Sequence, residues 1–231
     1  MRKDDRKNNE LREIKFTRDF TKHALGSVLA EFGDTKVITT ASVDFSKPKW
    51  MDKDLAQGWV TAEYSLLPSS TNTRCRRERT SISGRTQEIQ RLIGRSLRAC
   101  VDMSKMPDMT IIIDADVIQA DGGTRTASIC GGFLALRDAV DKLIQIGKLE
   151  ESPIIEPIAA ISAGIVDEEV RLDLNYEEDS SAQVDANIVL TKSGKIIEFQ
   201  TTAEGEPFSQ EKMLEIFETA KKGINKIISK Y

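Results

Sequence analysis

The alternation of apolar and polar residues divides the chain into short strands and longer helices. Residues 26–32 and 35–42 alternate on either side of Gly33-Asp34, which predicts a tight β-hairpin. Further strands are predicted at residues 59–67 and 109–118, and later at residues 159–166, 170–176, 184–191 and 196–202. Residues 192–195 close a second hairpin between the last two of these strands.

Apolar spacings of three and four residues predict three helices. The first begins at residue 86 and carries one apolar stripe, and the second runs from residue 126 or 127 to residue 144. The third covers residues 210–229, with Ser209 as its expected N-cap. Strands followed by helices twice over predict an α+β fold. We expect two related halves with mixed sheets, residues 1–148 and 158–231, packed as a single domain over residues 1–231.

Composition narrows the chemistry that this chain can perform. Of 231 residues, 39% are apolar and 30% are charged. No apolar run approaches the length of a membrane span, and no secretory signal opens the chain. We therefore expect a soluble, cytoplasmic protein. A single histidine, His23, leaves almost nothing from which to build a zinc site or a Ser-His-Asp triad. Cys100 and Cys130 are expected to be buried thiols, and Cys75 lies among arginines. Chemistry is therefore expected to depend on carboxylates, arginines, bound phosphate and Mg²⁺.

A glycine-rich run, residues 120–126, joins a predicted strand to a predicted helix. The pair Gly122-Gly123 permits a sharp turn and leaves backbone N–H groups uncovered, and the first N–H groups of a helix attract anions. Thr124 adds a hydroxyl, and Arg125 adds a planar fork of donors suited to phosphate. The alternative is a helix start in which the threonine caps its own backbone and the arginine lies in solvent. The absence of a GxxxxGK[ST] loop disfavours an ATP-dependent kinase.

Basic charge is concentrated between Arg74 and Arg98. This stretch holds eight arginines, no lysine and only two acids, although the whole chain has a net charge of −4. An acidic segment follows later in the chain, and its carboxylates either form a solvated turn or hold Mg²⁺ and supply an acid. Asp179 and Asp185 flank the turn between two predicted strands. The other acids, Asp173, Glu177 and Glu178, are expected at the surface or in support of the site.

Several segments resemble the ribonuclease PH family of bacteria. They are GRTQEIQRLIGRSLRA, QADGGTRTASI, LDLNYEEDS and TAEGEPFS, supported by GSVLAEFGDTKV and QGWVTAEYSLLP. The resemblance implies a duplicated βαβα core, similar to the second domain of ribosomal protein S5, and a hexameric ring built as a trimer of dimers. It also implies a phosphate-dependent 3′→5′ exoribonuclease, a tRNA nucleotidyltransferase that trims the 3′ ends of transfer RNA precursors and other RNA.

The resemblance, added to the patterns above, assigns roles to individual residues. Arg85, Gly123, Thr124 and Arg125 are expected to bind inorganic phosphate, the co-substrate. Asp179 and Asp185 are expected to be catalytic and to hold Mg²⁺. The loop arginines are expected to bind the RNA backbone, or else to form salt bridges between subunits: Arg74, Arg76, Arg77 and Arg79. A non-catalytic RNA-binding subunit of an exosome-like ring is the alternative function.

Two positions depart from the family pattern. Thr80-Ser81-Ile82-Ser83 stands where the family usually has a Gly-Lys pair, which affects the expected loop contacts with RNA. Asp5 stands where glycine is usual, which affects an N-terminal turn.

Overall fold

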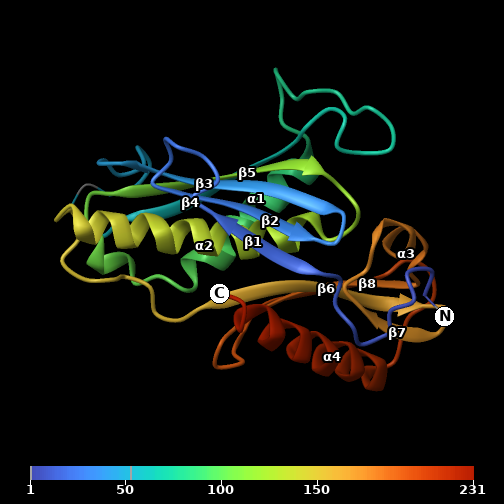
Figure 1. Cartoon of the computed structure of the whole chain (residues 1–231). Coiled ribbons are helices and arrows are strands. Elements are labelled where there is room, and N and C mark those ends of the chain that lie inside the picture. Colours follow the sequence, from blue (N-terminus) through green and yellow to red (C-terminus); the bar gives the residue numbers. More distant parts are fainter. Residues whose placement is uncertain (1, 53) are drawn as a thin grey trace.

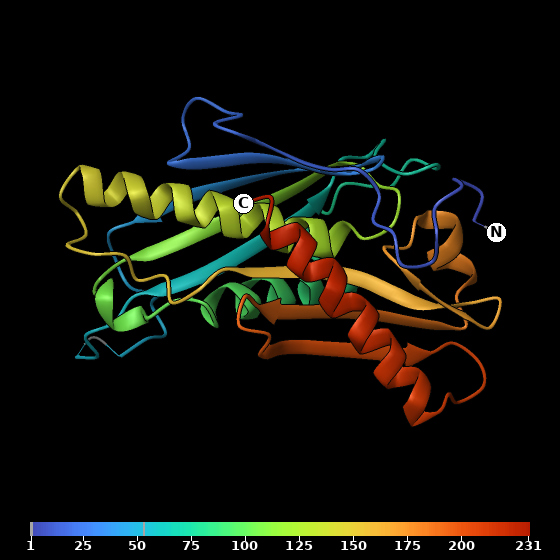
Figure 2. The same cartoon turned by 60° about the horizontal axis from the view of Figure 1, so that its bottom comes forward.

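Sheets and helices alternate in layers through the molecule (Figure 1). This computed structural model describes residues 2–52 and 54–231. The first sheet lies on one side, helices α1 (Gly84–Arg98) and α2 (Thr124–Gln145) lie beneath it, and the second sheet follows. Helix α4 (Gln210–Ile228) covers the outer face of the second sheet (Figure 2). The fold is α+β, as the sequence predicts.

The first sheet is mixed, and its strand order is β1-β2-β3-β5-β4. Strands β4 and β5 are parallel because α1 crosses between them, whereas the other neighbouring strands are antiparallel. The predicted hairpin is present: Phe32 pairs with Thr35, and Gly33 adopts φ +56° at the turn. The strands are β1 (Ile14–Arg18), β2 (Gly26–Phe32), β3 (Thr35–Asp44), β4 (Trp59–Leu66) and β5 (Thr110–Gln119).

The second sheet is antiparallel throughout, in the order β7-β6-β8-β9. Helix α2 packs against β2 and β3 on one side and against β6 on the other. This position explains its many small, buried residues, and one hydrophobic core therefore runs through both halves of the chain. The strands are β6 (Ile158–Val166), β7 (Glu169–Leu172), β8 (Val184–Thr191) and β9 (Ile196–Ala203).

The acidic segment differs from its prediction as a strand over residues 170–176. Strand β7 ends at Leu172, Asp173 turns the chain at φ +55°, and helix α3 (Tyr176–Ser181) follows. A capping box starts this helix, because the Asn175 side chain accepts from the Glu178 amide while the Glu178 carboxylate accepts from the Asn175 amide. Asp179 therefore lies within a short helix and not just past a strand. Strand β1 and a 3-10 helix, Met103–Lys105, were also absent from the sequence prediction.

The other helices follow the predicted pattern with shifted ends. Helix α1 begins at Gly84 with Ser83 as its N-cap, two residues earlier than expected, and α2 begins directly after the glycine pair. Ser209 caps α4 by accepting from the Lys212 amide, as expected. None of the helices in the described residues has both the length and the apolar character needed to cross a membrane.

Candidate functional site

One cavity of about 390 Å³ collects the predicted phosphate and carboxylate residues from both halves of the chain. It lies at the C-terminal end of β5, where the glycine-rich turn leads into α2, and it faces α3 and the start of β8. Its lining includes Arg85, Gly123, Thr124, Arg125, Asp179 and Asp185. Residues separated by 100 positions in the sequence thus meet in one place.

The glycine-rich turn presents backbone donors to this cavity. Gly122 and Gly123 adopt φ +73° and +65°, and a Cβ at Gly122 would lie 2.5 Å from the carbonyl oxygen of Leu174. Helix α2 starts at Thr124 without a side-chain cap, and within residues 2–52 and 54–231 no protein group accepts from the amides of Gly123, Thr124 or Arg125. The alternative in which the threonine caps its own backbone is therefore not observed. Uncompensated donors at a helix start are suited to an anion.

A tyrosine that sequence reasoning missed orients the Thr124 hydroxyl. Tyr64 lies on β4, and its hydroxyl is 2.9 Å from Thr124 Oγ1. Burial raises the pKa of Tyr64, so its hydroxyl stays neutral at ordinary pH. Only the pairing of β4 beside β5 brings this side chain to the turn, so no local pattern in the sequence identifies it.

The two arginines that line the cavity differ in exposure and in the number of their partners. Arg85, near the start of α1, is exposed and forms no hydrogen bond or ion pair with the other described residues. The Arg125 side chain is only 16% exposed, and its Nη1 lies 3.7 Å from Glu88 Oε1 and 3.5 Å from Gln200 Oε1. Arg125 is therefore not directed into bulk solvent. Glu88, which the sequence interpretation assigned no role, competes with any anion for this guanidinium.

Asp179 and Asp185 both face the cavity, and their environments disfavour ionisation. Burial raises the pKa of Asp185 most and the Asp179 carboxylate raises it further, to about 6, although Arg125 and Asn187 act in the opposite direction. Burial also raises the pKa of Asp179, against the attraction of Arg125 and Arg85. Asp185 Oδ2 accepts a 3.3 Å hydrogen bond from Asn187, whereas the buried Oδ1 atom has no hydrogen-bond partner. A carboxylate with one unpartnered buried oxygen can hold a proton or a ligand.

Asp173 and Glu178 are buried, which agrees with the expected supporting role and not with the alternative of a surface position. Arg2, also buried, forms a two-pronged pair with Glu178 at 2.8 and 2.6 Å. Arg12 donates to Asp173 at 2.7 Å. These pairs fix α3 and the residues before it, so the two acids support the site without lining its cavity. Glu177 is exposed, as expected.

The four loop arginines lie outside the cavity, on the segment between β4 and α1 that extends away from the body of the chain (Figure 1). All four are exposed, and none forms an ion pair within the described residues: Arg74, Arg76, Arg77 and Arg79. Their guanidinium groups are thus available to an external polyanion or to acids of another subunit. Cys75, between them, is half-buried, and its thiol is 3.6 Å from the carbonyl oxygens of Leu67 and Pro68.

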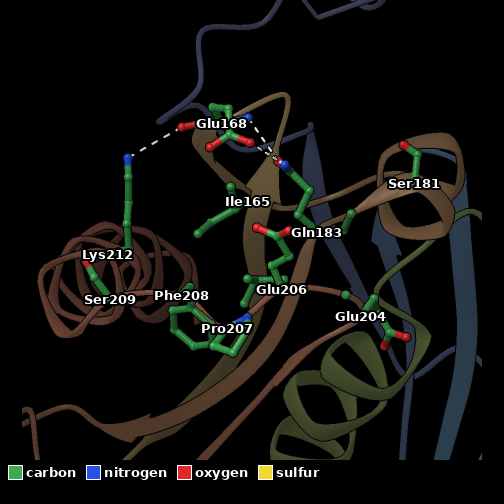
Figure 3. Close-up of a pocket in the computed structure, with 13 residues that line it drawn as sticks. Ile165, Glu168, Ser181, Gln183, Glu204, Glu206, Pro207, Phe208, Ser209 and Lys212 are labelled. Atoms are coloured by element: carbon green, nitrogen blue, oxygen red, sulfur yellow. Dashed lines mark hydrogen bonds between the residues drawn. The ribbon is translucent and has the colours of Figure 1, made fainter.

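A second, larger hollow of about 540 Å³ adjoins the first and shares Glu204 with it. Figure 3 shows the side chain of Glu206 inside this hollow, with Phe208 and Pro207 on one side and Gln183 on the other. Lys212 is engaged there by the Glu168 carbonyl and by Glu215. The lining of this larger hollow includes several acids and no arginine, so the smaller cavity is better suited to an anion.

The described residues contain no group of three or more His, Cys, Asp or Glu side chains placed to hold a metal ion. The pair Asp179 and Asp185 does suit Mg²⁺, which commonly takes one or two carboxylates and completes its shell with water and substrate phosphate. The unpartnered Asp185 Oδ1 atom supplies one such oxygen.

The chain thus combines a two-sheet α+β fold with a glycine-rich turn that shares one cavity with two aspartates. Residues 10–140 match domain 1 of the 3′ exoribonuclease family, also called RNase PH, and residues 156–223 match its domain 2. The chain therefore belongs to the 3′ exoribonuclease family, and its fold is that of ribonuclease PH.

Solved structures show the same fold at low sequence identity. The Rrp46 protein of rice (Oryza sativa) is 21% identical, with a TM-score of 0.80 over 99% of this chain and 97% of that one. The Archaeoglobus fulgidus exosome with RNA bound to the active site is also 21% identical, with a TM-score of 0.84 over 99% and 92%. An archaeal exosome core is 20% identical, with a TM-score of 0.80 over 98% and 89%.

Proposed function

We propose that this chain is a phosphate-dependent 3′→5′ exoribonuclease that works as a subunit of an RNA-degrading ring. The observation that carries this proposal is the meeting of an anion cradle with two aspartates of raised pKa in one cavity. Arg85, the amides after Gly122, the Thr124 hydroxyl and Arg125 hold inorganic phosphate. Asp179 and Asp185 serve the departing ribose oxygen.

Phosphoryl transfer needs an aligned nucleophile, neutralisation of negative charge and help for the leaving oxygen. An orthophosphate oxygen attacks the phosphorus of the last phosphodiester and forms a new P–O bond. The bond from that phosphorus to the preceding 3′-oxygen breaks, and a nucleoside diphosphate leaves. The freed 3′-oxygen takes a proton, so the RNA ends in a 3′-hydroxyl one nucleotide shorter. The reverse reaction adds nucleotides.

Asp185 is suited to supply this proton. With a pKa of about 6, its carboxyl is protonated in about one tenth of molecules at pH 7, far more often than an ordinary aspartic acid. If Asp185 is the acid, the phosphorolysis rate falls as pH rises above 6. The synthesis rate, which needs the carboxylate as base, rises over the same range.

In the alternative arrangement, in which Asp185 acts through a metal and not as the acid itself, Mg²⁺ would be held by the ionised carboxylates of Asp179 and Asp185. When bound, it would neutralise charge that develops on the phosphate and ribose oxygens.

The exposed loop arginines and Tyr176 supply contacts for RNA. Guanidinium groups at Arg74, Arg76, Arg77 and Arg79 bind backbone phosphates without reading sequence. Tyr176 lines the cavity, its side chain is half exposed, and Asp121 accepts from its backbone amide at 3.2 Å. This fixed aromatic face suits any base, as an exonuclease that trims varied ends requires.

The second candidate is a non-catalytic RNA-binding ring subunit. The observation in its favour is the similarity to exosome subunits over nearly the whole chain. These similarities support a ring subunit better than a separate enzyme for transfer RNA precursors. We therefore propose RNA 3′ ends in general as the substrates, with the ends of transfer RNA as one example. We propose a homohexamer as the form of this ring. We also propose a cytoplasmic location, because reducing compartments keep cysteines such as these free.

A degradation assay separates the two candidates. Purified protein is incubated with 5′-labelled single-stranded RNA and Mg²⁺ in a non-phosphate buffer, with and without inorganic phosphate. We expect stepwise shortening and nucleoside diphosphates only when phosphate is present. Shortening at the same rate without phosphate contradicts phosphorolysis, and RNA binding without any shortening supports the non-catalytic subunit.

Substitutions test the phosphate cradle within the same assay. Arg85→Ala and Arg125→Ala are expected to raise the KM for phosphate and lower turnover while RNA binding persists. Arg91→Ala is the matched control, because Arg91 is an exposed arginine of α1 that does not line the cavity. Unchanged KM and kcat in the first two variants would remove both arginines from the site.

A further inference from the structure

The backbone of the glycine-rich turn is held by two residues that do not line the cavity. Arg12 precedes strand β1, and its Nη1 donates to the carbonyl oxygen of Asp121 at 2.5 Å, while its Nη2 lies 3.4 Å from the carbonyl oxygen of Gly122. Thr35 begins strand β3, and its hydroxyl donates to the same Gly122 carbonyl at 2.6 Å. Thr35 Oγ1 also accepts from the Asp121 amide at 2.9 Å.

These contacts determine the direction of the backbone donors. In a planar trans peptide the C=O and N–H bonds point in opposite directions. Because Thr35 and Arg12 hold the Gly122 carbonyl on one side, the Gly123 amide points to the other side, where the cavity lies. The glycine pair would otherwise be the most freely rotating part of this backbone.

The side chains of Thr35 and Arg12 are buried, and Arg12 is paired with an acid. Thr35 is fully buried, and the Arg12 side chain is 6% exposed. The Asp173 carboxylate fixes the arginine twice, since Oδ1 accepts from Nη2 at 2.7 Å and Oδ2 accepts from the Arg12 backbone amide at 2.8 Å. Asp173 belongs to the second half of the chain, so the pair also ties the turn to the segment that leads into α3.

We propose that Thr35 and Arg12 are positioning residues that set the affinity of the glycine-rich turn for inorganic phosphate. This inference rests on the proposed function for the identity of the anion. Neither residue touches the anion, and both act through the orientation of the Gly123 amide. Because the amides of the turn already point at the anion, the backbone does not need to rearrange when phosphate binds, and no binding free energy is spent on that rearrangement.

Thr35 offers the sharper test, because removing Arg12 would leave Asp173 buried without its partner and endanger folding. Thr35→Val keeps the branched shape of the side chain and replaces the hydroxyl with a methyl group. Thr35→Ser restores the hydroxyl. Thr39→Val is the matched control, since Thr39 is an equally buried threonine of β3 whose hydroxyl donates to the Val28 carbonyl, away from the turn.

Two measurements are made on each variant: binding of inorganic phosphate by calorimetry, and steady-state phosphorolysis at varied phosphate. Thr35→Val is expected to raise the phosphate Kd and KM by roughly three- to tenfold, because the hydroxyl's hydrogen bonds to the Gly122 carbonyl and the Asp121 amide are both lost. The KM for RNA and the kcat at saturating phosphate are expected to stay close to wild type. Thr35→Ser is expected to recover phosphate binding, and Thr39→Val to leave it unchanged.

The outcomes distinguish this inference from the proposed function. If wild-type protein binds phosphate but releases no nucleoside diphosphate, phosphorolysis is refuted, and the calorimetric series still decides the role of Thr35. A phosphate Kd in Thr35→Val equal to that of wild type overturns the inference, as does an equal loss in Thr39→Val. Absence of phosphate binding by the wild-type protein overturns both.

Discussion

Replacing Asp185 by asparagine should stabilise the protein while removing its activity. The pKa of the Asp185 carboxyl rises from 3.8 to about 6 in the folded chain, chiefly through burial. The folded state therefore holds this proton more tightly than the unfolded state does. Above pH 6 the folded protein must keep a buried carboxylate ionised, which costs about 3 kcal/mol of stability at the usual value per pKa unit. Asparagine avoids this cost, because it is uncharged and has nearly the same shape.

The pH dependence identifies the cause. For a carboxyl whose folded pKa is raised, the cost is absent below the unfolded value, grows between pH 4 and 6, and is complete above 6. We expect Asp185→Asn to gain about 3 kcal/mol over wild type at pH 7.5 but about 1.5 kcal/mol at pH 5. These figures are upper values, because a buried asparagine amide also needs hydrogen-bond partners.

Urea unfolding followed by circular dichroism, at matched protein concentration, measures both values. Asp141→Asn is the control, because it makes the same substitution at an exposed position of α2 outside the cavity. Single-turnover degradation of RNA should fall at least about 100-fold in Asp185→Asn, the usual contribution of a general acid. A variant less stable than wild type at pH 7.5, or one with a near-normal single-turnover rate, would refute the reasoning.

Four further outcomes follow from the structure. RNA affinity should fall with salt at a log–log slope of about −3 if four loop arginines each neutralise one phosphate, and a slope near zero in a filter-binding assay would contradict this. Glu88→Gln should lower the KM for phosphate about two- to fivefold by releasing Arg125, the usual range for an exposed ion pair, and a higher KM in steady-state kinetics would instead show that Glu88 aligns the arginine. Tyr176→Ala should raise the KM for RNA by about fivefold or more in the same assay while Tyr176→Phe does not, since stacking needs only the ring. Asp5→Gly should raise the melting temperature by about 1–3 °C, because Asp5 adopts φ +60°, and a fall in a thermal melt would show that its side chain matters more than its backbone.

The sequence was most informative where a local pattern determines local structure. The hairpin at Gly33-Asp34, the capped helix α4 and the turn between β5 and α2 follow from short-range spacing and turn chemistry. The same holds for the cavity residues that lie beside that turn. At Asp5 the backbone takes the left-handed conformation that favours glycine, which agrees with the glycine that the family resemblance implies for this position.

The prediction missed one local signal and several contacts that only tertiary packing decides. The alternating residues after β7 suggested a longer strand, but the capping box at Asn175 and Glu178 starts a helix there; its Asn-x-x-Glu spacing was the signal available in the sequence. The burial of Asp173 depends on Arg12, which lies 161 positions away. Tyr64 reaches the cavity through strand pairing, and Glu88 reaches Arg125 through helix packing, which no local pattern encodes.

The lining of the cavity comes from both sequence halves: the first supplies the residues proposed to bind phosphate, and the second supplies the two aspartates. Because a continuous apolar interior joins these halves, the distance between reagent and acid is set by the packing of the whole chain. Neither half alone contains all the residues of the proposed reaction centre, so each half is expected to be inactive without the other.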